Sequence, residues 1–221
     1  MTWGEIDQLG KDYRNKPEDL QHMVGMKKSV TYEGIGTGDV EIVDICHSDY
    51  GGVHTFVFMS CVSLQTTIYG TDCKNYRNTT ICWDLEHGIY WNALPEDLRN
   101  VMKSVNTKYY SSATQYWGSQ TDPKTALSKY FLPSVAEIGL STGKDFSAEG
   151  TVFQKFTSNS SRIRYNIGTE TPCKWWTRSL TAYYNNKGAY IYVWTDGGFS
   201  SSYIVNAYEN NAYGVVPVFC I

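Results

Sequence analysis

The sequence predicts a single domain of the α+β class, with antiparallel sheets and a few short helices. Helical signals lead the chain, beginning with Thr2-Trp3-Gly4-Glu5, which matches a capping box. Strand signals dominate the end of the chain, from residue 173 onward. The two kinds of signal do not alternate as repeated βαβ units and no internal repeat occurs, so the α+β class is favoured over a parallel α/β fold.

The N-terminal part, residues 1–60, is expected to form a helix and a hairpin. The capping box predicts a helix of about ten residues through Leu9. Residues 24–45 predict a hairpin, because strand-like runs flank a glycine-rich turn at 34–38. A further strand is predicted at 55–59, after a turn formed by two adjacent glycines.

The middle of the chain predicts short helices and one strand. Residues 79–90 carry apolar side chains at a spacing of four, which suits a short helix that Gly88 weakens. Residues 94–105 give the strongest helical signal, with a proline in the first turn, acidic residues beside it and one apolar stripe. Residues 130–132 indicate a strand, and a second capping box predicts a helix at 134–138.

Composition and charge exclude two kinds of partner. Hydrophobic residues make up 42% of the 221 residues and charged residues 19%, as in globular domains. A net charge of −3 at pH 7 lacks the basic footprint of a nucleic-acid binder. No stretch approaches the roughly 18 apolar residues of a membrane span, so membrane insertion is not expected. The first residues do not resemble a signal peptide, and synthesis in the cytoplasm is expected.

No motif predicts catalysis, a cofactor or a metal. A nucleophile motif and a glycine-rich phosphate loop are missing from the sequence, so the protein is not expected to be an enzyme. Cys46-His47-Ser48-Asp49 with His54 is the only cluster of potential metal ligands, and we favour a polar turn over a zinc site. The six cysteines contain no C-x-x-C pair and are predicted to be buried thiols: Cys46, Cys61, Cys73, Cys82, Cys173 and Cys220.

Residues 181–212 predict a binding face, because they consist largely of tyrosine, asparagine, serine, glycine and small apolar residues. Tyrosine and tryptophan offer large contact areas with few rotatable bonds, while serine, glycine and asparagine offer adaptable hydrogen bonds. Pairs of asparagines indicate loops, and the tyrosines cluster around them. The alternative is a tyrosine-rich sheet with one solvated face. The side chains expected to point outward to a ligand are Tyr183, Tyr184, Asn185, Asn186, Tyr190, Tyr192, Trp194, Phe199, Ser201, Tyr203, Asn206, Tyr208 and Asn210.

The segments beside this tract predict rigid structure. Trp175, Trp176 and Arg178 favour a framework in which the guanidinium donates to buried carbonyls, over a cation–π platform for sugars. The motif WTDGG at 194–198 predicts a hairpin turn, which we favour over a calcium site because few oxygen ligands lie nearby in sequence. The run VVPVF at 215–219 predicts a central strand of a sheet.

Three ordered motifs carry a resemblance to a known family. FLPSVAEI at 131–138, WWTRSL at 175–180 and YGVVPVFCI at 213–221 resemble the landmarks FLxSxxEx, WWLRSP and YGVRPxFxI. These landmarks belong to a domain family of unknown function from phages and bacteria. The resemblance covers nearly the whole chain. Leu180 stands where the family has proline, and Val216 stands where it has arginine.

The resemblance implies a C-type-lectin-like fold, in which the two ends of the lectin region pair as strands. Phage tropism determinants and the variable proteins of diversity-generating retroelements share this fold and bind through a variable face rich in tyrosine and asparagine. By this resemblance residues 1–221 form one such domain, in which 173–221 are the lectin-type segment that carries the face. Residues 1–180 and 213–221 would supply a rigid frame.

The function that the resemblance implies is non-enzymatic receptor binding. The expected protein is tail-associated in a phage or prophage, or is a retroelement variable protein, and it binds a host cell-surface protein or glycan. It would lie on the virion or tail, or on a cell surface after release, and could form a homo-oligomer, a trimer at a tail tip. Two alternatives stay open. One is a bacterial surface adhesin; the other is a formylglycine-generating type of enzyme, whose closely spaced cysteine pair has no counterpart here because Cys173 and Cys220 lie far apart in sequence.

Overall fold

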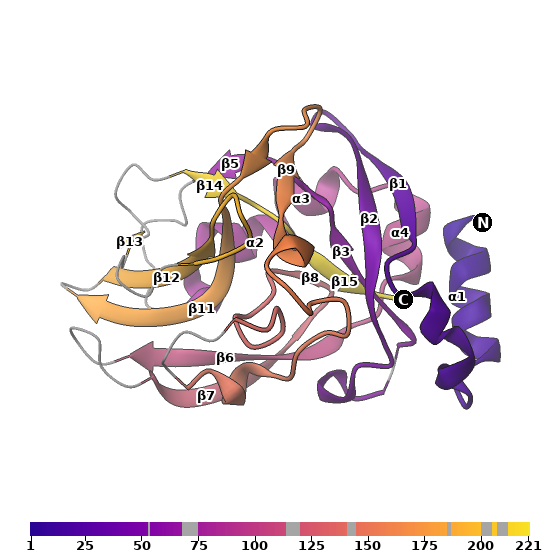
Figure 1. Ribbon diagram of the computed structural model, residues 1–221, viewed down its shortest axis with the longest axis horizontal. Coiled ribbons are helices and arrows are strands. Elements are labelled where there is room, and N and C mark those ends of the chain that lie inside the picture. Colours follow the sequence, from indigo (N-terminus) through magenta and orange to yellow (C-terminus); the bar gives the residue numbers. More distant parts are fainter. Residues whose placement is uncertain are drawn as a thin grey trace.

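Two five-stranded sheets organise the protein (Figure 1). The computed structural model describes residues 1–52, 54–67, 75–113, 120–140, 145–184, 187–199, 205–206 and 212–221. Among these residues the strands form the two five-stranded sheets, one three-stranded sheet and one two-stranded hairpin. Most neighbouring strands are antiparallel and the helices are short, so the predicted α+β class is confirmed.

The first sheet brings residues from both ends of the sequence together. Its order is β1 (Lys27–Tyr32), β2 (Gly36–Ile45), β3 (Phe56–Ser60), β15 (Val218–Cys220) and β8 (Tyr130–Phe131), all antiparallel to their neighbours. The predicted hairpin and the predicted strands at 55–59 and 130–132 are therefore confirmed. The last strand is central, as predicted, but it begins only at Val218, because Pro217 has no N–H to donate to a neighbouring strand.

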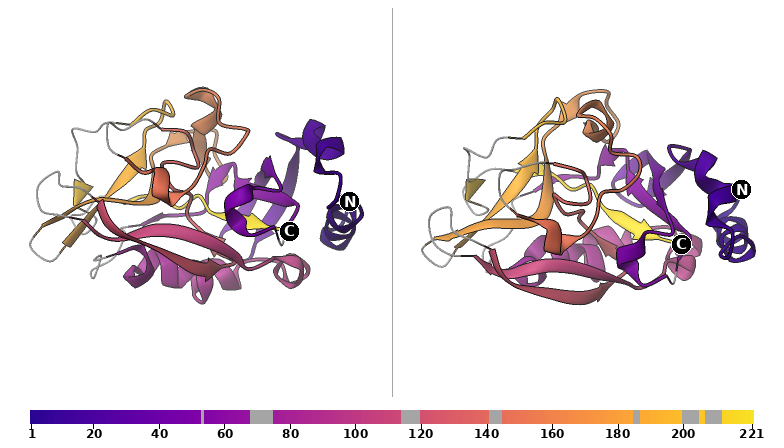
Figure 2. Two further views of the ribbon diagram at one scale, coloured as in Figure 1. Left: turned by 90° about the horizontal axis from the view of Figure 1, so that it is seen from below. Right: turned by 60° about the horizontal axis from the view of Figure 1, so that its bottom comes forward.

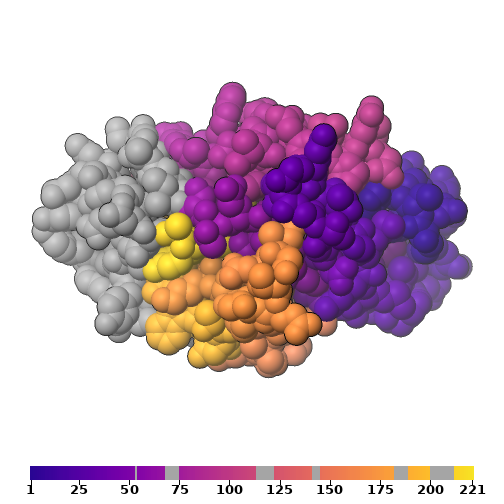
Figure 3. Space-filling model, turned by 90° about the horizontal axis from the view of Figure 1, so that it is seen from above, coloured from indigo at the N-terminus to yellow at the C-terminus, as the bar shows by residue number. Residues whose placement is uncertain are grey.

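The second sheet contains the strands of the predicted binding region. Its order is β13 (Val205–Asn206), β12 (Lys187–Val193), β11 (Trp175–Tyr184), β14 (Tyr213–Gly214) and β5 (Thr66–Thr67), with β11 and β14 parallel. A smaller sheet contains β10 (Pro172–Cys173), β9 (Arg164–Asn166) and β4 (Val62–Ser63). Along the chain, β4 connects β3 to β5, and β9 and β10 connect β8 to β11. In the space-filling view, the orange segment that contains β9 and β10 meets the violet N-terminal strands at the surface (Figure 3).

The capping box at the start of the chain forms as predicted. The hydroxyl of Thr2 accepts from the N–H of Glu5 at 3.2 Å, and the Glu5 carboxylate accepts from the Thr2 N–H at 2.6 Å. These bonds begin α1 (Trp3–Asp12), which is followed by the 3-10 helix η1 (Pro17–Met23). The buried face of α1 contributes Trp3, whose ring contacts those of Phe58 and Phe219 at centroid distances of 5.6 and 6.0 Å.

The remaining described helices are short, and the two predicted at 79–90 and 94–105 are shorter than the sequence predicts. These helices are η2 (Ser48–Tyr50), η3 (Tyr76–Asn78), α2 (Thr80–Glu86), α3 (Ile89–Asn92), α4 (Glu96–Val101), η4 (Ser147–Glu149) and η5 (Ser160–Arg162). The predicted helix at 79–90 is two helices, because the chain leaves helical geometry between them at Gly88. The predicted helix at 94–105 ends at Val101, because the N–H of Lys103 donates to the carbonyl of Cys220 at 2.9 Å and draws the chain onto the first sheet. None of the described helices has the length and apolar composition that a membrane crossing requires.

The hairpin of β6 (Val105–Ala113) and β7 (Gln120–Ser128) has no counterpart in the sequence-based prediction. Much of β7 is exposed and polar and it contains Pro123, which disfavours a strand, so the alternating apolar signal is weak. Figure 2 shows the hairpin along one side of the molecule, directed toward the outer ends of β11 and β12. The hairpin therefore braces the strand that leads into the predicted binding region.

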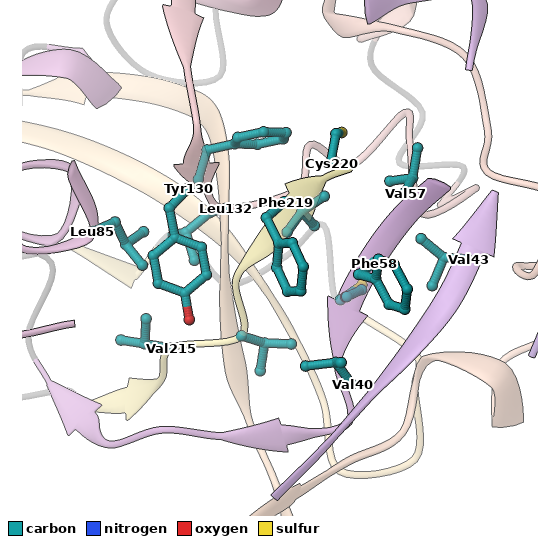
Figure 4. Packing of buried hydrophobic residues seen from close by; sticks show 14 of the residues in the cluster. Val40, Val43, Val57, Phe58, Leu85, Tyr130, Leu132, Val215, Phe219 and Cys220 are labelled. Atoms are coloured by element: carbon teal, nitrogen blue, oxygen red, sulfur yellow. The ribbon is translucent and has the colours of Figure 1, made fainter. Parts of the chain in front are cut away.

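The core surrounds β15 (Figure 4). The rings of Phe219 and Phe58 stack with centroids 5.3 Å apart and planes 11° from parallel. Side chains from helix α2, from β8 and from the segment before β15 close over them, and Leu85, Tyr130 and Val215 are fully buried there. Residues from both ends of the sequence thus share one apolar cluster.

Candidate binding face

The outer ends of β11 and β12 lie at the end of the molecule opposite to α1 (Figure 1). At their inner ends both strands are anchored by fully buried side chains, among them Trp175, Trp176 and Val193. The indole N–H of Trp175 donates to the carbonyl of Arg162 at 3.1 Å, and that of Trp176 donates to the carbonyl of Thr67 at 2.9 Å. The framework role that the sequence predicts for the tryptophan pair is therefore confirmed.

Two of the residues predicted to point outward to a ligand are instead part of the core. Tyr190 is 0% exposed and Tyr192 is 7% exposed, so the prediction that they point outward is wrong. The reason is that apolar side chains cover both faces of β12. Tyr190 and Tyr192 pack into the main apolar cluster, and Ile191 packs on the other face into a second cluster with Tyr110 and Phe146. The alternative of a sheet with one solvated face is also wrong for this strand.

The remaining predicted contact residues divide into three groups. Trp194 and Phe199 are half-buried and border the two apolar clusters. Tyr183 and Tyr184 belong to β11 and Asn206 belongs to β13, and their side chains lie outside what the structure describes. A last group lies outside the described residues altogether: Asn185, Asn186, Ser201, Tyr203, Tyr208 and Asn210.

A cluster of aromatic rings joins the two ends of the segment 193–212. The rings of Tyr192 and Tyr213 lie with centroids 4.4 Å apart, and the ring of Trp176 lies 4.7 Å from that of Tyr213. The ammonium of Lys174 lies over both tyrosine rings, at 5.7 and 5.6 Å from their centroids. Burial and the neighbouring Tyr192 raise the pKa of Tyr213 to about 12, so the phenol stays neutral at physiological pH. We call these four residues the aromatic base.

The turn at 194–198 is a second anchor of the same segment. The N–H of Trp194 donates to the carbonyl of Gly198 at 2.7 Å, which confirms the predicted turn. Gly197 has φ +78°, and a Cβ on it would lie 1.8 Å from the carbonyl oxygen of Asn159. The guanidinium of Arg162 donates to the Gly197 carbonyl at 2.9 Å. The turn is therefore held against the segment before β9 by a contact that only glycine allows.

Arg178 fills the predicted role of a donor to buried carbonyls, and it also has an acidic partner. It donates to the carbonyls of Lys108, Leu132 and Glu149 at 2.8, 2.8 and 3.1 Å. Both oxygens of Glu137 accept from the same guanidinium, at 2.6 and 2.5 Å. Sequence reasoning missed Glu137 in this role, although the motif that contains it was visible as a capping box.

The capping box at 134–137 forms its hydrogen bonds without forming a helix. The N–H of Ser134 donates to Glu137 at 2.8 Å, and the N–H of Glu137 donates to the Ser134 hydroxyl at 3.1 Å. The chain then makes turns only, so the predicted helix at 134–138 is wrong. The bidentate pair with Arg178 holds the Glu137 side chain in the core and fixes the direction of the chain there.

The predicted polar turn at Cys46 to His54 is held by side-chain contacts. His47 Nδ1 lies 2.6 Å from Asp44, and the Asp49 carboxylate contacts Lys108 at 2.6 Å and the N–H of Thr151 at 2.7 Å. Burial alone would raise the pKa of Asp49, but the hydrogen bonds from Lys108 and Thr151 lower it to about 2. Among the described residues no group of three or more histidines, cysteines or acidic residues is placed to hold a metal ion.

The described cysteines are free thiols that differ in exposure. Cys82, Cys173 and Cys220 are buried, as predicted, whereas Cys46 and Cys61 are partly exposed because they lie at strand ends near the surface. Burial raises the pKa of Cys173 to about 11 and that of Cys220 well above its usual range. The prediction for Cys73 lies outside the described residues.

Comparison with known proteins identifies a family but no characterised relative. No curated protein and no solved structure matches the chain. The model of one family, described as a domain of unknown function (DUF6273), matches residues 64–221. That match spans most of the chain and includes the aromatic base, Arg178 and β15. The chain therefore belongs to the DUF6273 family.

Proposed function

We propose that this protein is a non-enzymatic binding module that presents side chains of the segment 181–212, other than the buried residues 189–193, on a rigid frame to a protein or glycan on a cell surface. The observation that carries the proposal is the aromatic base. Tyr192 and Tyr213 lie on the two sides of the segment 193–212, and their rings are in contact at 4.4 Å. The two ends of the segment therefore lie together on the frame, as do the ends of loops that carry binding sites on rigid scaffolds.

The composition of the segment supports contact with a macromolecular surface. Tyrosine, asparagine, serine and glycine combine broad contact area with adaptable hydrogen bonding. Because Tyr190 and Tyr192 are buried, they are not among the proposed contact residues. The proposed contact residues are Tyr183, Tyr184, Asn185, Asn186, Ser201, Tyr203, Asn206, Tyr208 and Asn210, with Trp194 and Phe199 at the border.

The resemblance to C-type-lectin-like proteins of phages supports a more specific version. In that version the protein is a tail-associated receptor-binding protein of a phage or prophage, or a variable protein of a diversity-generating retroelement. The raised pKa values of the buried thiols favour binding over enzymatic use of Cys173 or Cys220, because the thiolate is the nucleophile. The acidic balance of the chain favours a protein or glycan over nucleic acid as the ligand.

The test is binding of labelled protein to a panel of bacterial cells and to a glycan array. The double variant Tyr203→Ala/Tyr208→Ala is expected to lose at least tenfold in affinity for the cells that bind the wild type, since aromatic residues dominate binding energy in such faces. Tyr165→Ala changes an exposed tyrosine of β9, outside the face, and is the matched control. Equal binding by all three proteins would refute the assignment of the face. Failure of the wild type to bind any cell or glycan would refute the proposed ligand class.

A further inference from the structure

A buried cluster of ionisable groups joins β11 to the β6–β7 hairpin. The carboxylate of Glu149 accepts from the hydroxyl of Ser179 on β11 and, at 3.4 Å, from the N–H of Tyr110 on β6. Beside it, Arg178 holds the carboxylate of Glu137. The two glutamates and the arginine are each at most 1% exposed. Glu149 thus connects β11 and β6, which belong to different sheets, through its hydrogen bonds.

The charges in this cluster do not balance when both glutamates are ionised. One guanidinium faces two carboxylates, and its bidentate pair is made with Glu137. An ionised Glu149 therefore leaves one excess negative charge out of water, which is costly. A protonated Glu149 makes the cluster neutral and keeps both of its contacts, because its O–H can donate to the Ser179 oxygen while the other carboxyl oxygen accepts from Tyr110.

We infer that Glu149 is a proton-binding site that strengthens the junction between β11 and the β6–β7 hairpin in mildly acidic solution and weakens it as the solution becomes alkaline. The inference goes beyond the proposed function, since it concerns the frame and holds whether or not the face binds a cell surface. No sequence motif marks Glu149 for this role.

The pKa of Glu149 agrees with this geometry. Burial raises it to about 7, and the nearby Arg178 and the hydrogen bond from Ser179 oppose that rise only in part. In an unfolded chain the group returns to the ordinary value of 4.5. Between these two values the folded protein binds more protons than the unfolded chain, so the stability that protonation provides is fully present below pH 4.5 and is lost as the pH rises through 7.

The other charged and titratable groups around the cluster have settled partners or pKa values far from neutrality. They are Arg178 on β11, Glu137 in the turn after β8, Lys108 and Tyr110 on β6, Asp49 and Tyr50 on η2, and Asp145 before η4. Lys108 pairs with Asp49 at 2.6 Å. Burial raises the pKa of both tyrosines, so their phenols stay neutral. Although burial alone would lower the pKa of Arg178, Glu137 raises it, so the guanidinium stays charged.

The test is chemical denaturation of the wild type, Glu149→Gln and Glu170→Gln between pH 5 and pH 8. Glutamine reproduces the neutral form of Glu149, and Glu170 is an exposed residue that serves as the control. Relative to Glu149→Gln, the unfolding equilibrium constant of the wild type and of the control should rise about tenfold between pH 6 and pH 8. Parallel pH profiles for the wild type and Glu149→Gln would overturn the inference.

Two measurements on the wild type keep the inference testable if Glu149→Gln does not fold. Carbon-13 NMR of the glutamate carboxyl groups should show one group titrating near pH 7; titration of every glutamate below about pH 5.5 would contradict it. Amide hydrogen exchange, corrected for intrinsic rates, should show protection in β6 and β11 falling between pH 6 and pH 8 by at least as much as protection in β3, because opening of the junction adds to global unfolding. Protection in β6 and β11 that stays constant over this range would contradict the inference.

Discussion

The two large sheets both bury clusters of aromatic rings, but their surroundings differ. At the first sheet, Phe58 and Phe219 meet Trp3 of α1 in an apolar environment within the main core. In the aromatic base of the second sheet, Trp176 donates a hydrogen bond, Tyr192 and Tyr213 place two phenols side by side, and exposed Lys174 covers them. The first cluster therefore stabilises the fold alone, whereas the second also holds the ends of the proposed binding segment near the surface.

The largest loss of stability is expected from removing β1, β2 and β3, which lie outside the residues that match the family. A chain of residues 64–221 contains all that matches the family but lacks β1, β2 and β3, so β15 loses its pairing with Phe58 and its neighbours. We expect this chain not to fold, because the lost apolar burial exceeds the roughly 5–15 kcal/mol of stability of a typical domain. Circular dichroism and a two-dimensional NMR spectrum provide the measurement. A cooperative thermal transition in 64–221 would show that the first sheet is dispensable.

The second largest loss of stability is expected from replacing Arg178 on β11. Arg178→Met leaves Glu137 buried without its guanidinium, and breaking such a pair costs about 3–5 kcal/mol. Lys124→Met breaks an exposed ion pair at 3.0 Å on β7 and is expected to leave stability unchanged within experimental error. Urea denaturation of both variants measures the difference. Similar midpoints for the two variants would contradict the framework role of Arg178.

Truncation of a buried tyrosine in the second sheet should cost a comparable amount. Tyr190→Ala removes a fully buried ring, and removing an aromatic side chain from a core costs about 3–5 kcal/mol. Tyr165→Ala removes a ring that is 39% exposed and should cost clearly less. Equal losses of unfolding free energy would mean that the interior position of β12 does not determine the role of its tyrosines.

A smaller effect is expected at the turn that anchors the segment. Gly197→Ala places a Cβ against the Asn159 carbonyl, whereas Gly168→Ala, at a similar φ of +74°, meets no atom within 4 Å. Both variants strain a left-handed backbone, which costs about 1–3 kcal/mol. Only Gly197→Ala should lose more unfolding free energy than this strain accounts for. It should also shift the fluorescence of Trp194 in the same turn. Indistinguishable variants would show that contact with Asn159 does not fix the turn.

The sequence was sufficient for the elements whose signals are local. Thr2 and Glu5 form the predicted capping box, and the glycine-rich turn joins the predicted hairpin. The hairpin β6–β7 was beyond sequence reasoning, because an exposed strand that contains Pro123 lacks an alternating apolar pattern. Its position is determined instead by long-range contacts, such as the bond from Arg178 to Lys108.

The site could be predicted only as a segment and not residue by residue. Composition predicts a binding segment, but it does not predict whether one or both faces of a strand in that segment are covered. Tyr190 and Tyr192 are buried because the main apolar cluster covers their face of β12, and Ile191 is buried because a second cluster covers the other face. No periodicity in β12 reveals that both faces are covered. Likewise, Glu137 carried a visible capping signal, yet its main partner is 41 residues away in sequence.

The most direct test of the account is to replace the segment while keeping the frame. In this variant residues 200–204 and 207–211 become glycine and serine, and Val205 and Asn206 of β13 are retained. We expect its unfolding free energy to lie within about 1 kcal/mol of that of the wild type, because connections of equal length close at similar entropic cost. We also expect it to lose binding to the bacterial cells that the wild type recognises. A variant that unfolds, or one that folds and still binds these cells, would contradict the division into frame and face.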